Sequence, residues 1–404
     1  MEMRKLFKIG RLGAVATSAL LAACGGGGSG TGSSGSTADR EGTMRLALTD
    51  APACGYDEVN VSIERVEVHL SDSAPEGDQG WEKIVLSPAK RVNLLDLTNG
   101  ALEELGSADL PAGTYRQIRL VLAANSPGNP FANSVVPTGG EEVALDTPSA
   151  QQSGLKLKAQ MDVAAGETAD YVLDFDACKS VVRRGNSGRY NLKPVLSLLP
   201  GATGTTGLAV HGYVSAGLAP TASVSLQQEG VVARATVPDA QGKFVLSPVP
   251  AGNYDLVITA EGRVTAVMTG VPVSQASLTT VNPSTAPIDP PVSGSRTVSG
   301  TVTSGTTGVD ATLRALQTVG GTQIELAGVP ADADTGAYSF TLATGAPVKA
   351  AYSATATALT FAPDAAAAGK YTVEALVTGK APQTAAVDVS AANANATASF
   401  TFAP

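Results

Sequence analysis

The sequence predicts an all-β fold of three tandem sandwich-like domains, and three observations support this. The chain of 404 residues contains 44 glycines and 24 prolines, which interrupt it often. Between these breaks lie short runs rich in Val, Thr and Leu, many of which alternate apolar with polar residues. Charged residues make up only 16% and aromatic residues only 4% of the chain. Frequent turns between short alternating runs favour β-sandwiches over helix bundles, and the length allows several domains with their own cores.

The N-terminal residues have the layout of a secretory signal. A basic region precedes an apolar run over residues 12–21, which is shorter than the ~20 residues needed to cross a bilayer. The stretch Leu21-Ala22-Ala23-Cys24 that follows resembles the lipobox of bacterial lipoproteins, in which the cysteine is lipidated and becomes the mature N-terminus. This resemblance implies a signal peptide over residues 1–23 and a permanent lipid anchor at Cys24. The alternative is an ordinary secretory signal in which the cysteine occurs by chance.

Residues 24–42 are rich in Gly and Ser, so we expect a flexible tether with a reach on the order of 25 Å. Gly25 follows the cysteine in place of the aspartate that resembles an inner-membrane retention signal, so the expected location is the cell outer membrane. The net charge is -9, and removing residues 1–23, with four basic residues and one acidic, makes it -12. An acidic chain without a basic stripe argues against nucleic acid as a partner.

The first domain is expected over residues 43–200. Met44, Leu46 and Leu48 alternate with other residues, which predicts a half-buried strand. Between residues 59 and 70 the alternation slips by one residue, which predicts a β-bulge near Glu64 and Arg65. Residues 71–80 form a polar loop, and residues 101–105 could form a brief helical turn. Residues 81–86 and 92–97 suggest further strands or a short strand-turn unit. More strands are expected around residues 118–122, 135–136, 143–145, 155–157, 170–178 and 190–199.

Four motifs of this domain resemble the bacterial domain of unknown function 4382. They are residues 48–52 (Leu-Thr-Asp-Ala-Pro), 111–115 (Pro-Ala-Gly-Thr-Tyr), 173–182 and 190–194 (Tyr-Asn-Leu-Lys-Pro). The resemblance covers residues 43–199, and the motifs occur in the family's order. It implies an exported lipoprotein, and it implies no activity.

Two further domains are expected, over residues 207–288 and 296–404. In the second domain, Asp239-Ala240-Gln241-Gly242-Lys243-Phe244 and the later Pro250-Ala251-Gly252-Asn253-Tyr254 resemble the carboxypeptidase regulatory-like domain, a small transthyretin-like β-sandwich. The third domain repeats this order of signals around residues 334–338 and 369–371, with an Ala- and Thr-rich insertion over residues 353–368. We expect a divergent copy of the same sandwich, although the Ala-rich part could form a short helix. Turn chemistry common to all small sandwiches is the alternative explanation for both.

Two cysteines remain once Cys24 is assigned to the lipid. Cys54 and Cys178 form an even pair in a compartment that permits oxidation, so a disulfide between them is favoured. Two separate buried thiols are the alternative.

Acidic residues near these cysteines form the strongest candidate for a site. Strand alternation places Asp174, Asp176 and Cys178 on one face, and a disulfide to Cys54 would bring Asp50 and Asp57 near them. Four carboxylates repel one another unless they are neutralised, and Ca²⁺ takes oxygen ligands of this kind. In the favoured alternative no cofactor is bound, Asp50 caps a turn, and Asp174 and Asp176 pair with Lys179, Arg183 or Arg184.

No catalytic constellation is found beside this cluster. His69 and His211 fall in different expected domains, without a serine elbow or zinc-ligand spacing near them. We therefore expect a non-enzymatic envelope lipoprotein that binds or scaffolds a protein or glycan, with the C-terminal sandwiches as spacers or interaction modules. A carbohydrate-binding accessory protein is the alternative, although a chain with the single tryptophan Trp81 has few rings for stacking on sugars. A glycan-acting enzyme using Asp174 and Asp176 is less favoured.

Overall fold

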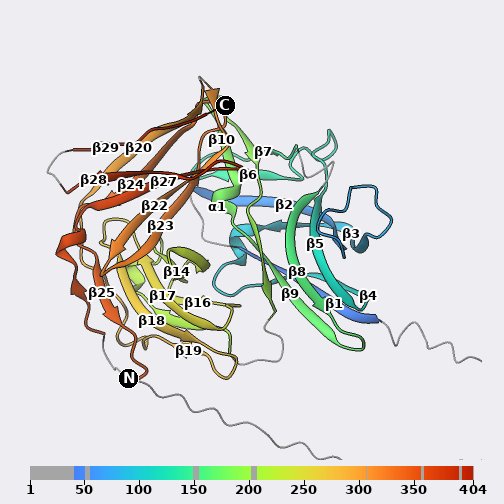
Figure 1. Ribbon diagram of the computed structural model, residues 1–404, viewed down its shortest axis with the longest axis horizontal. Coiled ribbons are helices and arrows are strands. Elements are labelled where there is room, and N and C mark those ends of the chain that lie inside the picture. The colour runs from blue at the N-terminus through green and yellow to red at the C-terminus, as the bar shows by residue number, and fades with distance from the viewer. Residues whose placement is uncertain are drawn as a thin grey trace, which may run out of the picture. The chain divides into compact units, whose positions relative to one another are not determined.

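The computed structural model describes residues 41–50, 55–148, 154–201, 207–305, 307–355, 359–390 and 394–403. Residues 37–404 form one compact unit, and the described part is almost entirely β-structure, as expected (Figure 1). Its buried apolar residues form three main clusters that follow the three expected domains. Within the described residues, no helix is long and apolar enough to cross a membrane.

The first domain packs two sheets face to face. One sheet has the strand order β12-β9-β1-β4, and the other has the order β10-β11-β7-β6-β2-β5-β8, with β3 also paired to β2. The elements are β1 (Glu41–Asp50), β2 (Tyr56–His69), β3 (Glu82–Asn93), η2 (Leu94–Leu97), β4 (Glu103–Pro111), β5 (Gly113–Leu122), β6 (Ser134–Pro137), β7 (Val143–Asp146), β8 (Leu155–Val163), β9 (Thr168–Phe175), α1 (Ala177–Ser180), β10 (Val181–Arg184), β11 (Arg189–Leu192) and β12 (Leu196–Pro200).

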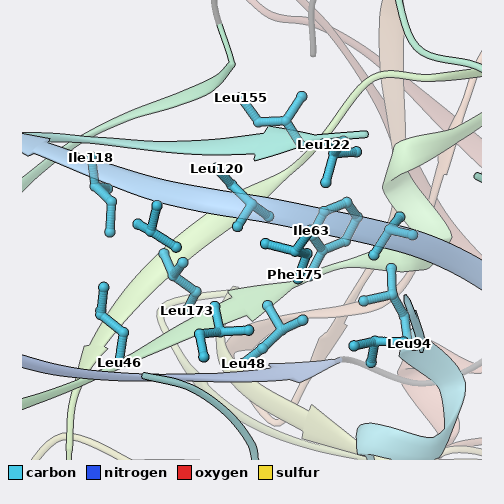
Figure 2. Close-up of a cluster of buried hydrophobic side chains, with 14 of the residues drawn as sticks. Leu46, Leu48, Ile63, Leu94, Ile118, Leu120, Leu122, Leu155, Leu173 and Phe175 are labelled. Atoms are coloured by element: carbon cyan, nitrogen blue, oxygen red, sulfur yellow. The ribbon is translucent and has the colours of Figure 1, made fainter. Parts of the chain in front are cut away.

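The core of this domain comes from the alternating residues that the sequence indicates. Met44, Leu46 and Leu48 are each at most 1% exposed. Figure 2 shows Leu46 and Leu48 beside Leu173 and Phe175, facing labelled residues of the other sheet such as Leu120. Fully burying a side chain of this size contributes about 1.5–3 kcal/mol, so these contacts supply most of the driving force for the domain.

The predicted bulge in the second strand is confirmed. The pairing of β2 with both β3 and β5 shifts register between Ile63 and Arg65. The extra residue returns the apolar side chains that follow, beginning with Val66, to the core face.

The helical turn suggested for residues 101–105 is wrong. Glu103 begins β4, which pairs antiparallel with β1 so that Leu48 lies opposite Glu103. Sheet pairing across more than fifty residues of sequence overrides the weak local preference for a turn.

The second domain also has two sheets, with strand orders β16-β13-β19 and β15-β14-β17-β18-β25-β26. Gly242 lies in the expected turn at φ +82, and a Cβ there would meet the carbonyl oxygen of Val214 at 2.0 Å, so only glycine fits. The elements are β13 (Val210–Tyr213), η3 (Ala216–Leu218), β14 (Ser223–Gln228), β15 (Val231–Thr236), β16 (Lys243–Leu246), β17 (Gly252–Thr259), β18 (Ala266–Val273) and β19 (Thr279–Thr280).

The third domain contributes strands to its own two sheets and to the second domain. Its sheets pair β20 with β21, β24, β29 and β30, and order the others β23-β22-β27-β28. The elements are β20 (Ser295–Ser304), β21 (Thr307–Gly308), β22 (Ala311–Val319), β23 (Thr322–Pro330), β24 (Ala337–Ala343), β25 (Val348–Ala351), β26 (Ala362–Pro363), η4 (Ala365–Ala367), β27 (Lys370–Val377), β28 (Gln383–Asp388), β29 (Ala396–Thr397) and β30 (Phe400–Phe402).

A strand from the third domain's part of the sequence joins a sheet of the second domain. β25 pairs parallel with β18, so the strand that precedes the Ala-rich insertion extends the second domain's sheet (Figure 1). A small apolar cluster of Val257, Val267, Val319 and Ile324 also links the two domains. The sequence predicts separate domains over residues 207–288 and 296–404, and the structure shows that residues of the latter range return to the second domain.

Candidate functional site

Parallel pairing brings the predicted acidic residues together at one end of a sheet. β1 and β9 run side by side in the same direction, with Thr49 opposite Asp174 and Asp50 opposite Phe175. Because their carboxyl ends meet, Asp50 lies beside the chain that leaves β9. Its Oδ1 accepts a hydrogen bond from the backbone N–H of Ala177 at 2.9 Å. Asp50 therefore caps the start of α1. The rest of the Asp-Ala-Pro turn in which the sequence places it lies outside the described residues.

Asp176 is the N-cap of the same short helix. Its Oδ1 accepts from the backbone N–H of Lys179 at 3.0 Å, which satisfies a donor that the helix itself leaves without a partner. The strand expected to run as far as residue 178 ends at Phe175, because this cap turns the chain into α1. Cys178 therefore lies on a helix and not on the strand face expected from the alternation.

A buried arginine from the second domain neutralises Asp174. Arg234 of β15 donates to Asp174 Oδ1 and also to the hydroxyl of Thr49. The side chain of Arg234 is 1% exposed and that of Asp174 is 13% exposed. Burial raises the pKa of Asp174 above its usual value, and Arg234 opposes that rise by favouring the carboxylate. The pair therefore joins the first two domains where water reaches little of either group.

A second set of ion pairs reaches the third domain. Lys179 Nζ lies 3.3 Å from Asp176 and 2.9 Å from Glu325 of β23. Arg314 of β22 contacts the same glutamate at 2.6 Å, and also Glu374 at 2.6 Å. Burial disfavours the charged forms of Lys179 and Arg314, yet their carboxylate partners raise both pKa values above the usual ones.

Two amide side chains reinforce these junctions by imitating backbone pairing. Gln227 donates to the carbonyl oxygen of Glu325 at 2.6 Å and accepts from its N–H at 2.8 Å, which joins β14 to β23. The side chain of Asn99, a residue at φ 56, accepts from the N–H of Val245 at 2.6 Å and donates to the carbonyl oxygen of Lys243 at 3.3 Å. All three domains are therefore joined by directional hydrogen bonds.

A cavity of about 340 Å³ lies where the three domains meet. Its lining combines small and apolar side chains with charged groups of the junction. The lining residues are Asp174, Asp176, Cys178, Lys179, Val195, Leu196, Ser197, Ser223, Ser225, Val232, Ala233, Ala235, Glu325, Leu326, Ala327, Gly328 and Val329.

The structure separates Asp57 from the other predicted site residues. Asp57 is exposed on β2, and its Oδ2 accepts from the N–H of Gly139 at 3.0 Å. Within the described residues, no group of three or more His, Cys, Asp or Glu side chains could hold a metal ion. Within the described part of the chain, the predicted calcium set of Asp50, Asp57, Asp174 and Asp176 is therefore not brought together. Helix caps and ion pairs use Asp50, Asp174 and Asp176, and Asp57 binds the backbone of Gly139.

The predicted pairing of acidic residues is partly confirmed. Lys179 does pair with Asp176, but Arg234 takes the place of Arg183 and Arg184 as the partner of Asp174. Arg184 lies near Asp146 and Asp334 instead, at 3.6 and 3.8 Å.

Only one of the three cysteines with a predicted modification, Cys178, lies in the described part of the chain. Cys24 and Cys54 fall outside the described residues, so the lipidation of Cys24 and the disulfide between Cys54 and Cys178 stay predictions. Cys178 lies in α1 and lines the cavity.

Neither histidine lines this cavity. His69 accepts a hydrogen bond from the N–H of Ser71 at 2.8 Å, and its ring centroid lies 5.0 Å from that of Trp81. Burial, followed by the charge of Lys243, lowers the pKa of His211.

Sequence reasoning missed the partners that the other domains supply. Arg234 lies in the run Val-Val-Ala-Arg-Ala-Thr, and Glu325 lies between Ile324 and Leu326. A single charge inside a short apolar strand is costly unless it is paired, so this pattern was a usable signal. Nothing in the sequence identifies which carboxylate or cation forms the pair.

Comparison with solved structures gives weak similarities. A type II cohesin–X-dockerin complex of Acetivibrio cellulolyticus is 27% identical over 20% of this chain and 56% of that chain, with a TM-score of 0.17. The Bacillus anthracis TIE protein is 13% identical over 90% of this chain and 51% of that one, with a TM-score of 0.18. The major pilin SpaA of Corynebacterium diphtheriae is 11% identical over 89% and 99% of the two chains, with a TM-score of 0.17.

These alignments do not establish a common fold. The chain spans between 51% and 59% of the length of the first three solved chains that it matches. No curated protein matches the sequence.

A family comparison gives the clearer result. The model described as "Domain of unknown function (DUF4382)" matches residues 41–194, which are the strands and helix of the first domain up to β11. These residues contain the four motifs on which the resemblance rests. The match therefore supports the family that the sequence motifs indicate for the first domain, the domain of unknown function DUF4382.

Proposed function

We propose that the protein is a non-enzymatic lipoprotein of the cell outer membrane whose three joined domains bind or scaffold a partner. The observation that carries this proposal is the set of buried ion pairs at the domain junction. Asp174 with Arg234 joins the first domain to the second, and Lys179 with Glu325 joins the first to the third. A body held in one arrangement loses less conformational freedom when it binds than domains on loose linkers do.

The proposal revises the role of the C-terminal domains. On the sequence alone they are spacers or separate interaction modules. Because both contact the acidic end of the first domain, we assign them to the same binding body. Leu21-Ala22-Ala23-Cys24 supports the lipid anchor, and the Gly- and Ser-rich tether supports free movement of the body at the membrane surface.

Mass spectrometry of the mature N-terminus tests the anchor. We expect residues 1–23 to be absent and Cys24 to carry acyl chains. Cys24→Ser should move the protein from the membrane fraction to the soluble fraction, whereas Ser29→Ala in the tether should leave it in the membrane fraction. An unmodified Cys24 in a membrane-free protein would disprove the anchor.

Crosslinking in intact envelopes tests the binding role. The wild-type chain should crosslink reproducibly to one protein or glycan component. Arg234→Met, which breaks the junction, should reduce that product, and the exposed-pair variant Arg263→Met should not. If both variants gave the wild-type product, the joined domains would not be the binding body.

A carbohydrate-binding accessory protein is the second candidate, and the surroundings of Trp81 weigh against it. Trp81 is 7% exposed, and the guanidinium carbon of Arg119 lies 3.7 Å from the centroid of its ring. The tilted ring of His69 lies nearby. Stacking on a sugar needs an accessible ring face, and these neighbours occupy Trp81. Binding of the full chain to a glycan array would favour this second candidate.

A glycan-acting enzyme has less support. Asp174 pairs with Arg234 and Asp176 pairs with Lys179, so each carboxylate of the candidate pair already contacts a cation. Turnover of chromogenic glycosides by the wild-type chain, lost in Asp174→Asn, would contradict the non-enzymatic proposal.

A further inference from the structure

Three strands at sheet edges surround the cavity at the domain junction. β12, β15 and β23 each stand at the end of the strand order in their own sheets. All three contribute lining residues, so the cavity exists only when the domains are joined. Its volume of about 340 Å³ falls at the small end of the range of about 300–1,000 Å³ that is usual for ligand sites.

Polar residues of the cavity lining have hydrogen-bonding groups without partners in the described part of the chain. Asp174 uses Oδ1 for Arg234, and within the described residues no protein donor reaches its Oδ2. Ser197 and Ser223 also line the cavity, and their hydroxyls likewise have no hydrogen bond to the described part of the chain. Ser197 lies directly opposite Asp174 in the pairing of β12 with β9. A carboxylate oxygen and a hydroxyl therefore stand side by side at the cavity wall.

The charge of the lining is negative. Asp174, Asp176 and Glu325 contribute three carboxylates, against the single ammonium of Lys179. Arg234 and Arg314 neutralise part of this charge, but neither of them lines the cavity. A ligand with one positive charge would balance the excess carboxylate of the lining. An ammonium group has only donors, so it can bond to the carboxylate oxygen of Asp174 and to serine hydroxyls that act as acceptors.

Most of the remaining lining residues are apolar. It includes Val232 and Ala233 of β15 together with Leu326, Ala327 and Val329 of β23. Such walls gain free energy by covering a compact apolar group, at about 25 cal/mol per Å² removed from water. They offer no donors to a carboxylate or phosphate.

We propose that this cavity binds a small molecule with an ammonium group attached to a compact apolar body. The ammonium contacts Asp174 Oδ2 and the hydroxyls of Ser197 and Ser223, and the apolar body packs between β15 and β23. This inference rests on the proposed binding function and names the ligand class of the same body.

Calorimetry on the full mature chain in detergent tests the proposal with benzylamine and its uncharged analogue benzyl alcohol. We expect one benzylamine per chain and at least tenfold weaker binding of the alcohol, which corresponds to about 1.4 kcal/mol. Equal affinities, or no heat from benzylamine at concentrations of about 1 mM, would overturn the proposal.

Two variants locate the binding and keep the test independent of folding. Ala233→Phe fills the apolar end and should abolish benzylamine binding. Ser197→Ala removes one exposed hydroxyl without disturbing an ion pair and should weaken binding several-fold, whereas Ser339→Ala on β24 should not change it. Wild-type affinity in Ala233→Phe would place the ligand elsewhere and reject this cavity.

The result is separable from the broader proposal. Because the titration uses purified protein, failure to bind benzylamine leaves the lipidation of Cys24 and the envelope crosslinks to be judged by their own measurements. An unlipidated Cys24 would reject the anchor and leave the cavity assignment in place.

Discussion

The interior of the first domain and the junction between the domains are both shielded from water, but different forces hold them. The interior is made of alternating apolar side chains such as Leu46, Leu48 and Leu173, which need no specific partner. The junction contains Arg234, Lys179 and other charged groups, each stable there only because a named carboxylate contacts it.

This difference determines how each region responds to amino-acid substitution. An apolar core tolerates replacement by another apolar side chain of similar size, because its free energy depends on area and volume. A buried ion pair loses its stabilisation when either member is removed, because the other charge stays without compensation. The junction therefore tolerates fewer substitutions than the core, whereas the core contributes more to the free energy of folding.

The largest expected effect is at Arg234. Arg234→Met removes the partner of Asp174 and should lower the free energy of unfolding by about 3–5 kcal/mol, the usual cost of leaving a buried charge unpaired. Denaturant unfolding measures it. Arg263→Met, which breaks the exposed pair with Asp289, is the matched control and should cost only about 0–1 kcal/mol. Equal costs for the two variants would contradict the distinction between junction and surface.

A core substitution should cost slightly less and act differently. Leu48→Ala is expected to lower the free energy of unfolding by about 2–5 kcal/mol through lost burial and a residual cavity. Because no charge is involved, the cost should be the same at pH 7 and at pH 10. Leu48→Met, which nearly conserves volume, should cost less than about 1.5 kcal/mol. A strong dependence of the Leu48→Ala cost on pH would break the comparison.

Lys179 offers a test based on pH. Its pKa is raised above the usual 10.5, so its contribution is fully present below that value and is lost as the pH rises through the raised pKa. Lys179→Met should therefore cost about 1–3 kcal/mol at pH 8 and progressively less above pH 10.5. Urea unfolding of both chains across this range provides the measurement. A gap that stayed constant would show that the ammonium charge is not what stabilises the junction.

The smallest expected effect is that of calcium. Because caps and ion pairs already engage Asp50, Asp174 and Asp176, melting curves in excess Ca²⁺ and in EDTA should coincide. A difference of several degrees between the curves would restore the calcium site that the sequence suggested.

Local patterns predicted most of the fold. The alternation at Met44, Leu46 and Leu48 and the bulge before Val66 are confirmed, because both reflect which side chains must face one core. Prediction failed over residues 101–105 and at Cys178. Residues 103–105 belong to a strand that pairs with β1, and Cys178 lies in a helix because Asp176 caps it. Alternation of apolar and polar residues does not reveal either contact.

For the site, the sequence identified the acidic residues and could not identify what they contact. Asp174 and Asp176 were selected because they lie near Cys178 in the sequence. Lys179 was expected as a partner because it lies three residues after Asp176. Arg234 and Glu325 come from sequence positions 60 or more residues beyond Asp174, so no local pattern predicts their approach.

The sequence by itself determined the all-β class and the alternating core, and its motifs indicated the resemblance of the first domain to DUF4382 that the family match supports; the lipid anchor at Cys24 stays a prediction. These follow from side-chain period, turn residues and short motifs, which act over neighbouring residues. Only the tertiary structure decided that β25 joins the second domain's sheet and that Arg234 and Glu325 meet the end of β9. Those outcomes depend on which surfaces pack together, and packing between distant segments is decided by the free energy of the whole fold.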